Sequence, residues 1–337
     1  MNDKVMLGHG SGGRMMRELV EKHFLPAFGS GGTGLGVEDS AVLPMPTGGR
    51  LAMTTDSYVV SPVFFPGGDI GDLAINGTVN DLAMAGATPL YITCGFIVEE
   101  GLPLTDLERI IASMAAAAAK AGVKIVAGDT KVVDRGKADG IFINTSGVGV
   151  VPDGVNVSAR GVKPGDAIIV SGTIGDHGMA VMSRREGLEF DGEIYSDSAP
   201  LNGLVARMLA ACPDIHAMRD PTRGGVTSTL VEFAEESKVC IVVDERALPV
   251  REAVRGACEI LGLDPMLVAN EGKLIAAVPK DKAEAVLAAM KEDEFGRDAV
   301  IIGEAVVDPP GKVYMKTLIG GTRIVDMLSG EQLPRIC

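Results

Sequence analysis

The sequence predicts a layered α/β or α+β protein with two domains. Segments of helical periodicity alternate with short apolar runs along most of the chain, which is the pattern of sheets covered by helices. The chain has 337 residues, 46% of them hydrophobic, and this exceeds one typical core. The pattern breaks over 152–164, where prolines and glycines gather. We therefore expect a domain boundary there.

The N-terminal part begins with glycine-rich stretches at 8–13 and 29–36 that flank a helical pattern over 14–24. Such glycines allow backbone amides to approach a phosphate, and they are equally typical of a flexible lid or linker. Both interpretations stay open. We expect residues 1–36 to form a flexible glycine-rich segment.

Strands and helices follow for a first domain over 37–153. Its predicted helices cover 69–86 and an alanine-dense stretch at 106–121. Its predicted strands cover 37–43, 51–56, 89–99, 123–133 and 141–151.

A second α+β domain is expected over 154–328. Its predicted helices cover 177–186, 200–211, 226–237, 250–261 and 281–290. Its predicted strands cover 167–171, 239–243, 273–278, 299–307 and 313–315. No fixed-period repeat is visible, which argues against a solenoid or a propeller. Residues 329–337 remain as a mobile tail.

Composition narrows the class of function. The formal net charge of -14 and the lack of a basic run argue against a nucleic-acid surface. The five cysteines are widely spaced without a C-x-x-C pair, so we expect no disulfide framework or zinc ribbon, and a reducing cytoplasm fits. No signal peptide or membrane-spanning run is apparent, so we expect a soluble protein.

Aspartates end several predicted strands. Asp39, Asp56 and Asp129 each lie in or directly after an apolar run, and strand ends deliver side chains to the sheet edge where ligand sites commonly lie. On the predicted helix 69–86, Asp69, Asp72, Asn76 and Asn80 share one face, with Asp81 beside them.

Converging short oxygen donors suit Mg²⁺, which also binds substrate phosphates. The set proposed for the metal is Asp39, Asp56, Asp81 and Asp129. Each of them taken singly is also explained as a helix cap or turn residue.

Two further motifs lie in the second half. Asp220-Pro221-Thr222-Arg223-Gly224-Gly225 precedes an apolar helix, so it is either a phosphate seat at a helix N-terminus or an ordinary Asp-Pro turn. Glu271 precedes a strand and is a candidate general base, although an isolated glutamate is more often a loop carboxylate.

The chain ends Pro334-Arg335-Ile336-Cys337. A terminal cysteine is poorly placed for a core, because chain ends fray, so a chemical role is favoured over a disordered end. The last seven residues, when extended, reach roughly 23 Å at about 3.3 Å per residue. That reach would carry a thiol from solvent into a cleft.

These motifs together resemble the HypE family of hydrogenase maturation factors. This family belongs to the ATP-using superfamily of aminoimidazole ribonucleotide synthetase and selenophosphate synthetase. The motifs that carry the resemblance over nearly the whole chain are Asp39-Ser40-Ala41-Val42, Thr54-Thr55-Asp56-Ser57, the stretch from Asn80 to Pro89, Gly128-Asp129-Thr130, the Asp220 to Gly225 motif and the Pro-Arg-Ile-Cys ending. Glu38 departs from the paired aspartates common in the superfamily.

The resemblance implies an aminoimidazole ribonucleotide synthetase-like two-domain fold, whose N-terminal sheet is shared in a homodimer, and ATP with Mg²⁺ in a cleft. It implies that Lys131 and Arg223 face phosphate oxygens, that Glu271 accepts protons and that Cys337 is the reactive residue. The implied cofactor-binding residues are Asp39, Asp56, Asn80, Asp81, Gly128, Asp129, Thr130, Arg223, Gly224 and Gly225.

The implied reaction is the ATP-dependent dehydration of a carbamoyl group on Cys337 to a thiocyanate. HypF donates the carbamoyl group, and a complex of HypC and HypD receives the cyanide for the iron of [NiFe]-hydrogenase. Two alternatives stay open: another ATP-dependent synthetase of the superfamily, such as a selenophosphate-forming enzyme, or a non-catalytic carrier that holds a metal fragment on Cys337. The lack of a cysteine in 8–13 argues against the first.

Overall fold

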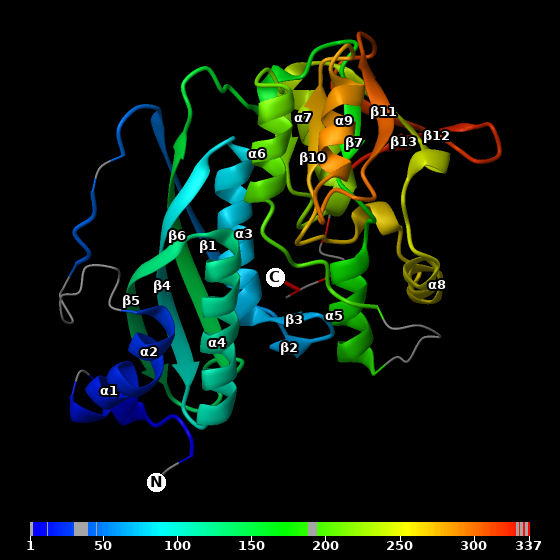
Figure 1. The fold of residues 1–337 in the computed structure, drawn as a ribbon. Coiled ribbons are helices and arrows are strands. Elements are labelled where there is room, and N and C mark those ends of the chain that lie inside the picture. Colours follow the sequence, from blue (N-terminus) through cyan, green and yellow to red (C-terminus); the bar gives the residue numbers. More distant parts are fainter. Residues whose placement is uncertain are drawn as a thin grey trace.

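A computed structural model describes residues 3–11, 13–29, 40–44, 46–187, 194–327, 330, 333, 336 and 337. It contains two units that lie side by side, each built on its own sheet, and the C-terminus lies between them (Figure 1). The mixed α/β architecture that the sequence predicts is confirmed.

The N-terminal unit is built on a four-stranded sheet in the order β1-β6-β4-β5. Its β4–β5 pair is parallel, and its other pairs are antiparallel. Helices α3 and α4 pack together against the sheet (Figure 1). The elements are β1 (Arg50–Tyr58), α3 (Ile70–Met84), β4 (Thr88–Glu99), α4 (Leu104–Ala121), β5 (Lys124–Val133), β6 (Ile141–Val151) and a short hairpin of β2 (Phe64–Phe65) and β3 (Gly68–Asp69).

Helix α3 lies at the centre of the molecule. Asp69 caps it, because its Oδ1 accepts hydrogen bonds from the backbone N–H groups of Gly71 and Asp72 at 2.8 and 3.2 Å. Nearly every residue of α3 is buried, since it contacts its own sheet on one side and α6 and β8 of the second unit on the other. Its polar stripe therefore faces the other unit.

The C-terminal unit is built on a seven-stranded sheet in the order β13-β12-β9-β11-β7-β10-β8. Only the β12–β9 pair is parallel. One core contains residues of α7, and another contains residues of α6 and α9. The strands are β7 (Ala167–Val170), β8 (Ala217–Arg219), β9 (Cys240–Asp244), β10 (Ile275–Val278), β11 (Val300–Val306), β12 (Lys312–Lys316) and β13 (Thr322–Val325). The helices are α5 (Asp176–Glu186), α6 (Asn202–Ala211), α7 (Gly225–Ser237), α8 (Glu252–Leu261) and α9 (Ala283–Lys291).

The described residues of the predicted flexible segment 1–36 are folded, which corrects that expectation for 3–11 and 13–29. Helix α1 (Arg14–Leu19), a π-helical turn (Val20–Phe24) and α2 (Leu25–Phe28) follow a 3-10 turn (Leu7–Gly10). Val5 and Phe24 are buried in the core of the N-terminal unit. Gly10 packs so closely on β5 that a Cβ there would lie 2.4 Å from Val132 N. This glycine therefore serves close packing.

Other differences concern short strands. The strand predicted over 37–43 is absent from its described part, 40–43, and residues 37–39 lie outside the described part of the chain. Strands β2, β3, β8 and β13, of two to four residues each, were not predicted, because so short a run carries little periodicity. No helix among the described residues combines the length and the apolarity needed to cross a bilayer.

Candidate functional site

The end of the chain is docked between the two units (Figure 1). The Ile336 side chain is 2% exposed and belongs to the core of the N-terminal unit. The backbone N–H of Val59, just after β1, donates a hydrogen bond to Cys337 O at 3.1 Å. Nε2 of His177, on α5, lies 2.6 Å from Ile336 O. Both units thus hold the terminus that the sequence predicts to be reactive.

The Cys337 thiol is surrounded by charged groups. Burial raises the pKa of this thiol to about 12, and the carboxylates of Glu271 and Asp56 add to the effect. The Arg223 side chain forms a hydrogen bond with Cys337 and acts in the opposite direction. The docked sulfur is therefore protonated at neutral pH and is a weak nucleophile.

Glu271 is buried beside this sulfur, with 3% of its surface exposed. Its backbone N–H donates to Asp197 Oδ1 at 3.0 Å, whereas its side-chain Oε1 has no hydrogen-bond partner among the described residues. Burial, followed by the charge of Asp220, raises the pKa of Glu271 well above its usual value. A carboxylate with a raised pKa binds protons more tightly, which suits a general base near neutral pH.

The Arg223-Gly224-Gly225 stretch begins helix α7. Gly224 and Gly225 have φ of 76° and 59°, a left-handed conformation that favours glycine. A Cβ on Gly225 would lie 2.5 Å from Met266 O, so the turn also needs glycine for space. It places the N-terminus of α7 next to Arg223, a combination that binds anions, although the Gly225 amide itself donates a hydrogen bond to Thr222 O at 2.9 Å.

Asp56, Asp81 and Asp220 add negative charge to the same region. Asp81 Oδ2 accepts a hydrogen bond from Thr54 Oγ1 at 2.7 Å. Burial raises the pKa of Asp81, and the neighbouring Asp56 adds to the shift. Burial, with the charge of Asp81, raises the pKa of Asp220 to about 7. The raised values show that these carboxylates lack sufficient positive charge nearby.

The predicted metal set is not assembled as one cluster. Asp39 lies outside the described residues. Asp129 belongs to the opposite face of the sheet from Asp56, because it pairs with Gly95 and alternates with the buried Thr130. Within the described ranges, no three Asp, Glu, His or Cys side chains are grouped to hold a metal ion. The missing factor in the sequence reasoning was which face of β5 Asp129 occupies.

Lys131 lies with Asp129 on this outer face. Its Nζ is 3.0 Å from Asp129 Oδ2, and the two side chains are 61% and 62% exposed. Gly128 adjoins this pair and approaches β4, where its Cβ would lie 3.0 Å from Cys94 O. The predicted residues thus form two groups: Asp56, Asp81, Arg223, Gly224, Gly225, Glu271 and Cys337 in the cleft, and Asp129 with Lys131 on the outer face of the four-stranded sheet.

Asn80 joins the two units. Its Nδ2 donates to Ala199 O and Glu271 O at 3.0 and 3.1 Å, and its Oδ1 accepts from Leu201 N at 2.8 Å. Its amide is thus engaged in holding α3 against the C-terminal unit. The predicted role of Asn80 in cofactor binding is therefore replaced, in this structure, by the positioning of the Glu271 backbone.

Sequence reasoning missed the residues that support the docked tail. His177 contacts Ile336 O, Asp197 accepts from Glu271 N, and Lys273 Nζ lies 3.1 Å from Asp197 Oδ2. The glycine-rich stretch from Ser171 to Gly178 was a weak indication that His177 lines a pocket. Its position at the start of a helix favoured a structural role instead, and the contact with the tail was not predicted. Among the described residues, the buried Asn76 Oδ1 and Glu271 Oε1 have no hydrogen-bond partner, whereas the buried Asp176 Oδ1 and Asp197 Oδ2 form ion pairs with Arg251 and Lys273.

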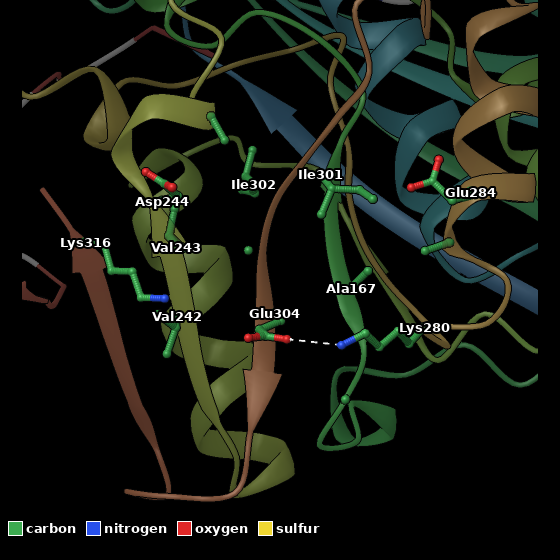
Figure 2. Close-up of a pocket in the computed structure, with 14 residues that line it drawn as sticks. Ala167, Val242, Val243, Asp244, Lys280, Glu284, Ile301, Ile302, Glu304 and Lys316 are labelled. Carbon is green, nitrogen blue, oxygen red and sulfur yellow. Dashed lines mark ion pairs between the residues drawn. The ribbon is translucent and has the colours of Figure 1, made fainter. Parts of the chain in front are cut away.

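Two cavities lie in the C-terminal unit. One, of about 310 Å³, is lined by Asp176, Asp197 and Lys273 among others, and so adjoins the support of Glu271. The other, of about 470 Å³, lies against β9 and β11 (Figure 2). In it the charges of Lys280 and Glu304 pair at 3.7 Å. It contains none of the predicted residues.

Family models match both units. Residues 37–151 match the N-terminal domain of AIR synthase related proteins, and residues 163–316 match the C-terminal domain of the same family. The carbamoyl dehydratase HypE of Cupriavidus necator is 56% identical over 99% of this chain and 95% of its own length.

Solved structures give the same result. A crystal structure of hydrogenase maturation protein HypE in complex with ATP aligns with a TM-score of 0.94 and 50% identity, covering 98% of this chain and 99% of that one. The HypE of a HypE–HypF complex aligns with a TM-score of 0.80 and 55% identity, covering 82% and 90% of the two chains. The chain therefore belongs to the HypE family of carbamoyl dehydratases, hydrogenase maturation proteins with the two domains of AIR synthase related proteins.

Proposed function

We propose that this chain is an ATP-dependent carbamoyl dehydratase whose substrate is an S-carbamoyl group on its own Cys337. The single observation that carries the proposal is the position of the terminal thiol, which lies half-buried beside Glu271 and Arg223. Family membership supports it, because the relatives of this chain include proteins named carbamoyl dehydratase HypE.

The overall reaction is Cys337–S–CO–NH₂ plus ATP giving Cys337–S–C≡N, ADP, phosphate and a proton. The carbamoyl oxygen attacks the γ-phosphorus, and the bond from that phosphorus to ADP breaks. The oxygen then leaves carbon as phosphate, while nitrogen gives up its two protons and forms the nitrile. Phosphorylation is needed because an amide-type oxygen is a poor leaving group.

Three features of the chain serve these steps. Glu271, with its raised pKa and unpartnered oxygen, is the proposed acceptor of the N–H protons. Arg223 and the N-terminal amides of α7 are the proposed stabilisers of charge on the transferred phosphoryl group. The docked tail supplies the alignment, since a reacting group held in place gains rate over one that diffuses.

Asp56 and Asp81 are the proposed Mg²⁺ ligands on the cleft side. A magnesium ion in a nucleotide site commonly takes only one or two carboxylates, and substrate phosphates and waters complete its coordination. The charge of Asp56 is one cause of the raised pKa of Asp81. A bound cation would reduce the repulsion between these two carboxylates. When bound, Mg²⁺ neutralises phosphate charge. Asp39 and Asp129 stay predicted ligands.

We further propose that the chain is a homodimer joined through the outer face of its four-stranded sheet. Leu51, Met53 and Ile97 are 57%, 70% and 45% exposed on this face, and such apolar exposure is typical of an interface. Asp129 and Lys131 lie on the same face, so a partner subunit would stand beside them. Thr130 is buried on the opposite side of β5 from Asp129, so its nucleotide contact and that of Gly128 stay predictions.

Partners and compartment follow from the proposed reaction. HypF is the proposed carbamoyl donor, because a HypE has been solved in complex with HypF. HypC and HypD remain the proposed acceptors of cyanide that the family resemblance implies. Because Cys337 is half-buried and docked between the two units, we propose that the tail leaves the cleft for both exchanges. All five cysteines are free, which fits the proposed cytoplasmic location.

The test is a mass measurement on the C-terminal peptide of the full chain after carbamoylation by HypF. We expect Mg-ATP to remove the mass of one water from this peptide. A Cys258→Ala variant, which loses a buried cysteine elsewhere in the chain, serves as the control and should behave like the wild type. An unchanged mass on the carbamoylated peptide would instead identify a carrier.

A further inference from the structure

His177 is a buried residue that the proposed chemistry does not use. It is the second residue of α5 and is 0% exposed. Its ring lies edge-on to Phe65 of the N-terminal unit, with centroids 5.5 Å apart and planes at 89°. It is therefore held between the two units, beside the docked end of the chain.

Both ring nitrogens of His177 have partners. Nε2 lies 2.6 Å from Ile336 O, and Nδ1 lies 2.9 Å from Ser196 Oγ. A carbonyl oxygen only accepts, so Nε2 must carry the proton. In the neutral ring, Nδ1 then accepts from the Ser196 hydroxyl, whose oxygen in turn accepts from Ser198 N–H at 3.1 Å. The hydrogen bonds run in one direction, from Ser198 through Ser196 and His177 to the tail.

The three residues 196–198 connect this chain of hydrogen bonds to the reacting groups. Ser196 supports His177, and Asp197 accepts from the backbone N–H of Glu271 at 3.0 Å. Ser198 Oγ donates to Asp72 Oδ1, on α3, at 2.6 Å. One short turn thus fixes the tail, the proposed base and the central helix relative to one another.

We propose that His177 is a positioning residue that latches the docked tail through the Ile336 carbonyl and sets where the Cys337 carbamoyl group meets Glu271. The proposal rests on the dehydratase function proposed above. A histidine with only a structural role in the core would not need a hydrogen-bond partner in the tail, which leaves the cleft during the proposed reaction cycle. His177 places its one donor on the residue next to the reactive cysteine.

Two amide variants separate the latch from a packing role. Glutamine carries its nitrogen at the position of Nε2 and keeps the reach to Ile336 O, whereas asparagine carries its amide nearer Nδ1 and loses it. We compare His177→Gln, His177→Asn and His177→Ala in the full chain. His216→Asn is the control, because His216 is also buried, at 8% exposed, but contacts Asp166 in the C-terminal unit.

Two readouts are needed. The first is the rate at which iodoacetamide alkylates Cys337 without ATP, measured on the C-terminal peptide. The second is kcat and the KM for ATP in dehydration of the carbamoylated tail. Thermal melting checks that each variant is folded.

We expect His177→Ala and His177→Asn to raise the alkylation rate about fivefold, the effect of losing one hydrogen bond. Their kcat should fall about tenfold with an unchanged KM for ATP, because the carbamoyl group is misplaced. His177→Gln should stay within about twofold of wild type in both readouts, as should His216→Asn. Equal behaviour of the Gln and Asn variants, or wild-type alkylation in His177→Ala, would overturn the latch. If the wild type makes no thiocyanate while the alkylation differences hold, the proposed function fails and the latch stands.

Discussion

At the scale of single residues, the cleft holds more negative charge than the described residues neutralise. Glu271, Asp81 and Asp220 all have raised pKa values, and burial is the first cause in each case. Among the described residues, Arg223 opposes this charge at Cys337, and Arg219 lowers the pKa of Asp81 and Asp220. Such a cluster costs folding stability and is kept where function needs it.

Asp220 gives a pH prediction. A carboxyl group whose pKa is raised to about 7 on folding stabilises the folded state fully below its unfolded pKa and partly between the two pKa values. That contribution is lost as pH rises through about 7. We therefore expect Asp220→Asn to melt several degrees above wild type at pH 8 and at the same temperature at pH 4, without nucleotide. A melting temperature that is lower than wild type at pH 8 would show that ionised Asp220 is stabilising.

Glu271 gives a prediction for activity. Glu271→Gln keeps the size and the backbone contacts of this residue but cannot accept a proton. Loss of a general base typically costs between about 10² and 10⁴ in rate, so we expect thiocyanate formation to fall by at least about a hundredfold. The KM for ATP should stay unchanged, because the site of phosphoryl transfer is intact. Activity within a few fold of wild type would remove Glu271 from the role of base.

At the scale of elements, long periodic segments were predictable, and the faces of strands were not. Helices α3, α4 and α7 and strands β4 to β6 lie within a few residues of their predicted ranges. A bulge between β4 and β5 shifts the register by one residue beyond Ile92. Such a shift moves each following side chain to the other face of the sheet. No pattern in the sequence predicted this bulge. Asp129 and Lys131 lie beyond the bulge.

The polar stripe of α3 shows the same limit. Its spacing correctly placed Asp72, Asn76 and Asn80 on one face, which meets the C-terminal unit and where Asn76 and Asn80 are buried and Asp72 is half-buried. The partners of Asn80 come from residues about 120 and 190 positions away, so its use in joining the units could not be predicted locally. Glu271 and Cys337 were identified by type and context, and the structure brings them together.

The turn before α7 gives a stability prediction. Gly225→Ala would place a Cβ in contact with the carbonyls of Met266 and Val268 at a left-handed φ. We expect it to destabilise the fold by at least about 2 kcal/mol in urea unfolding. Gly256→Ala on α8 is the control, because its Cβ would meet nothing within 4 Å. It should stabilise by about 0.5–1 kcal/mol. Equal effects of the two substitutions would contradict the account of the turn.

At the scale of the whole molecule, the predicted nucleotide residues lie on both faces of one sheet. Asp56 of β1 lies on the cleft face near Asp81 of α3, and the outer face holds Asp129 and Lys131. A homodimer that covers the outer face would bring the second group beside a partner subunit. The proposed dimer is therefore part of the proposed catalytic arrangement.

Met53→Lys tests the dimer, because it puts a charge on the apolar outer face where Met53 is 70% exposed. We expect dissociation to become at least about tenfold easier in analytical ultracentrifugation, as an unpaired interfacial charge costs several kcal/mol. Ile319→Lys, at a residue that is 95% exposed in the other unit, should leave the dimer intact. A Met53→Lys variant that associates like wild type would exclude this face as the interface.

In the proposed mechanism, the docked Cys337 carbamoyl group is phosphorylated on its oxygen and then dehydrated in the cleft. The most direct test is to label that carbamoyl oxygen with the heavy isotope of oxygen, start the reaction with Mg-ATP and analyse the released phosphate by mass spectrometry. This mechanism predicts one labelled oxygen in each phosphate that is released as a thiocyanate forms. Unlabelled phosphate, with the label released into water, would contradict it.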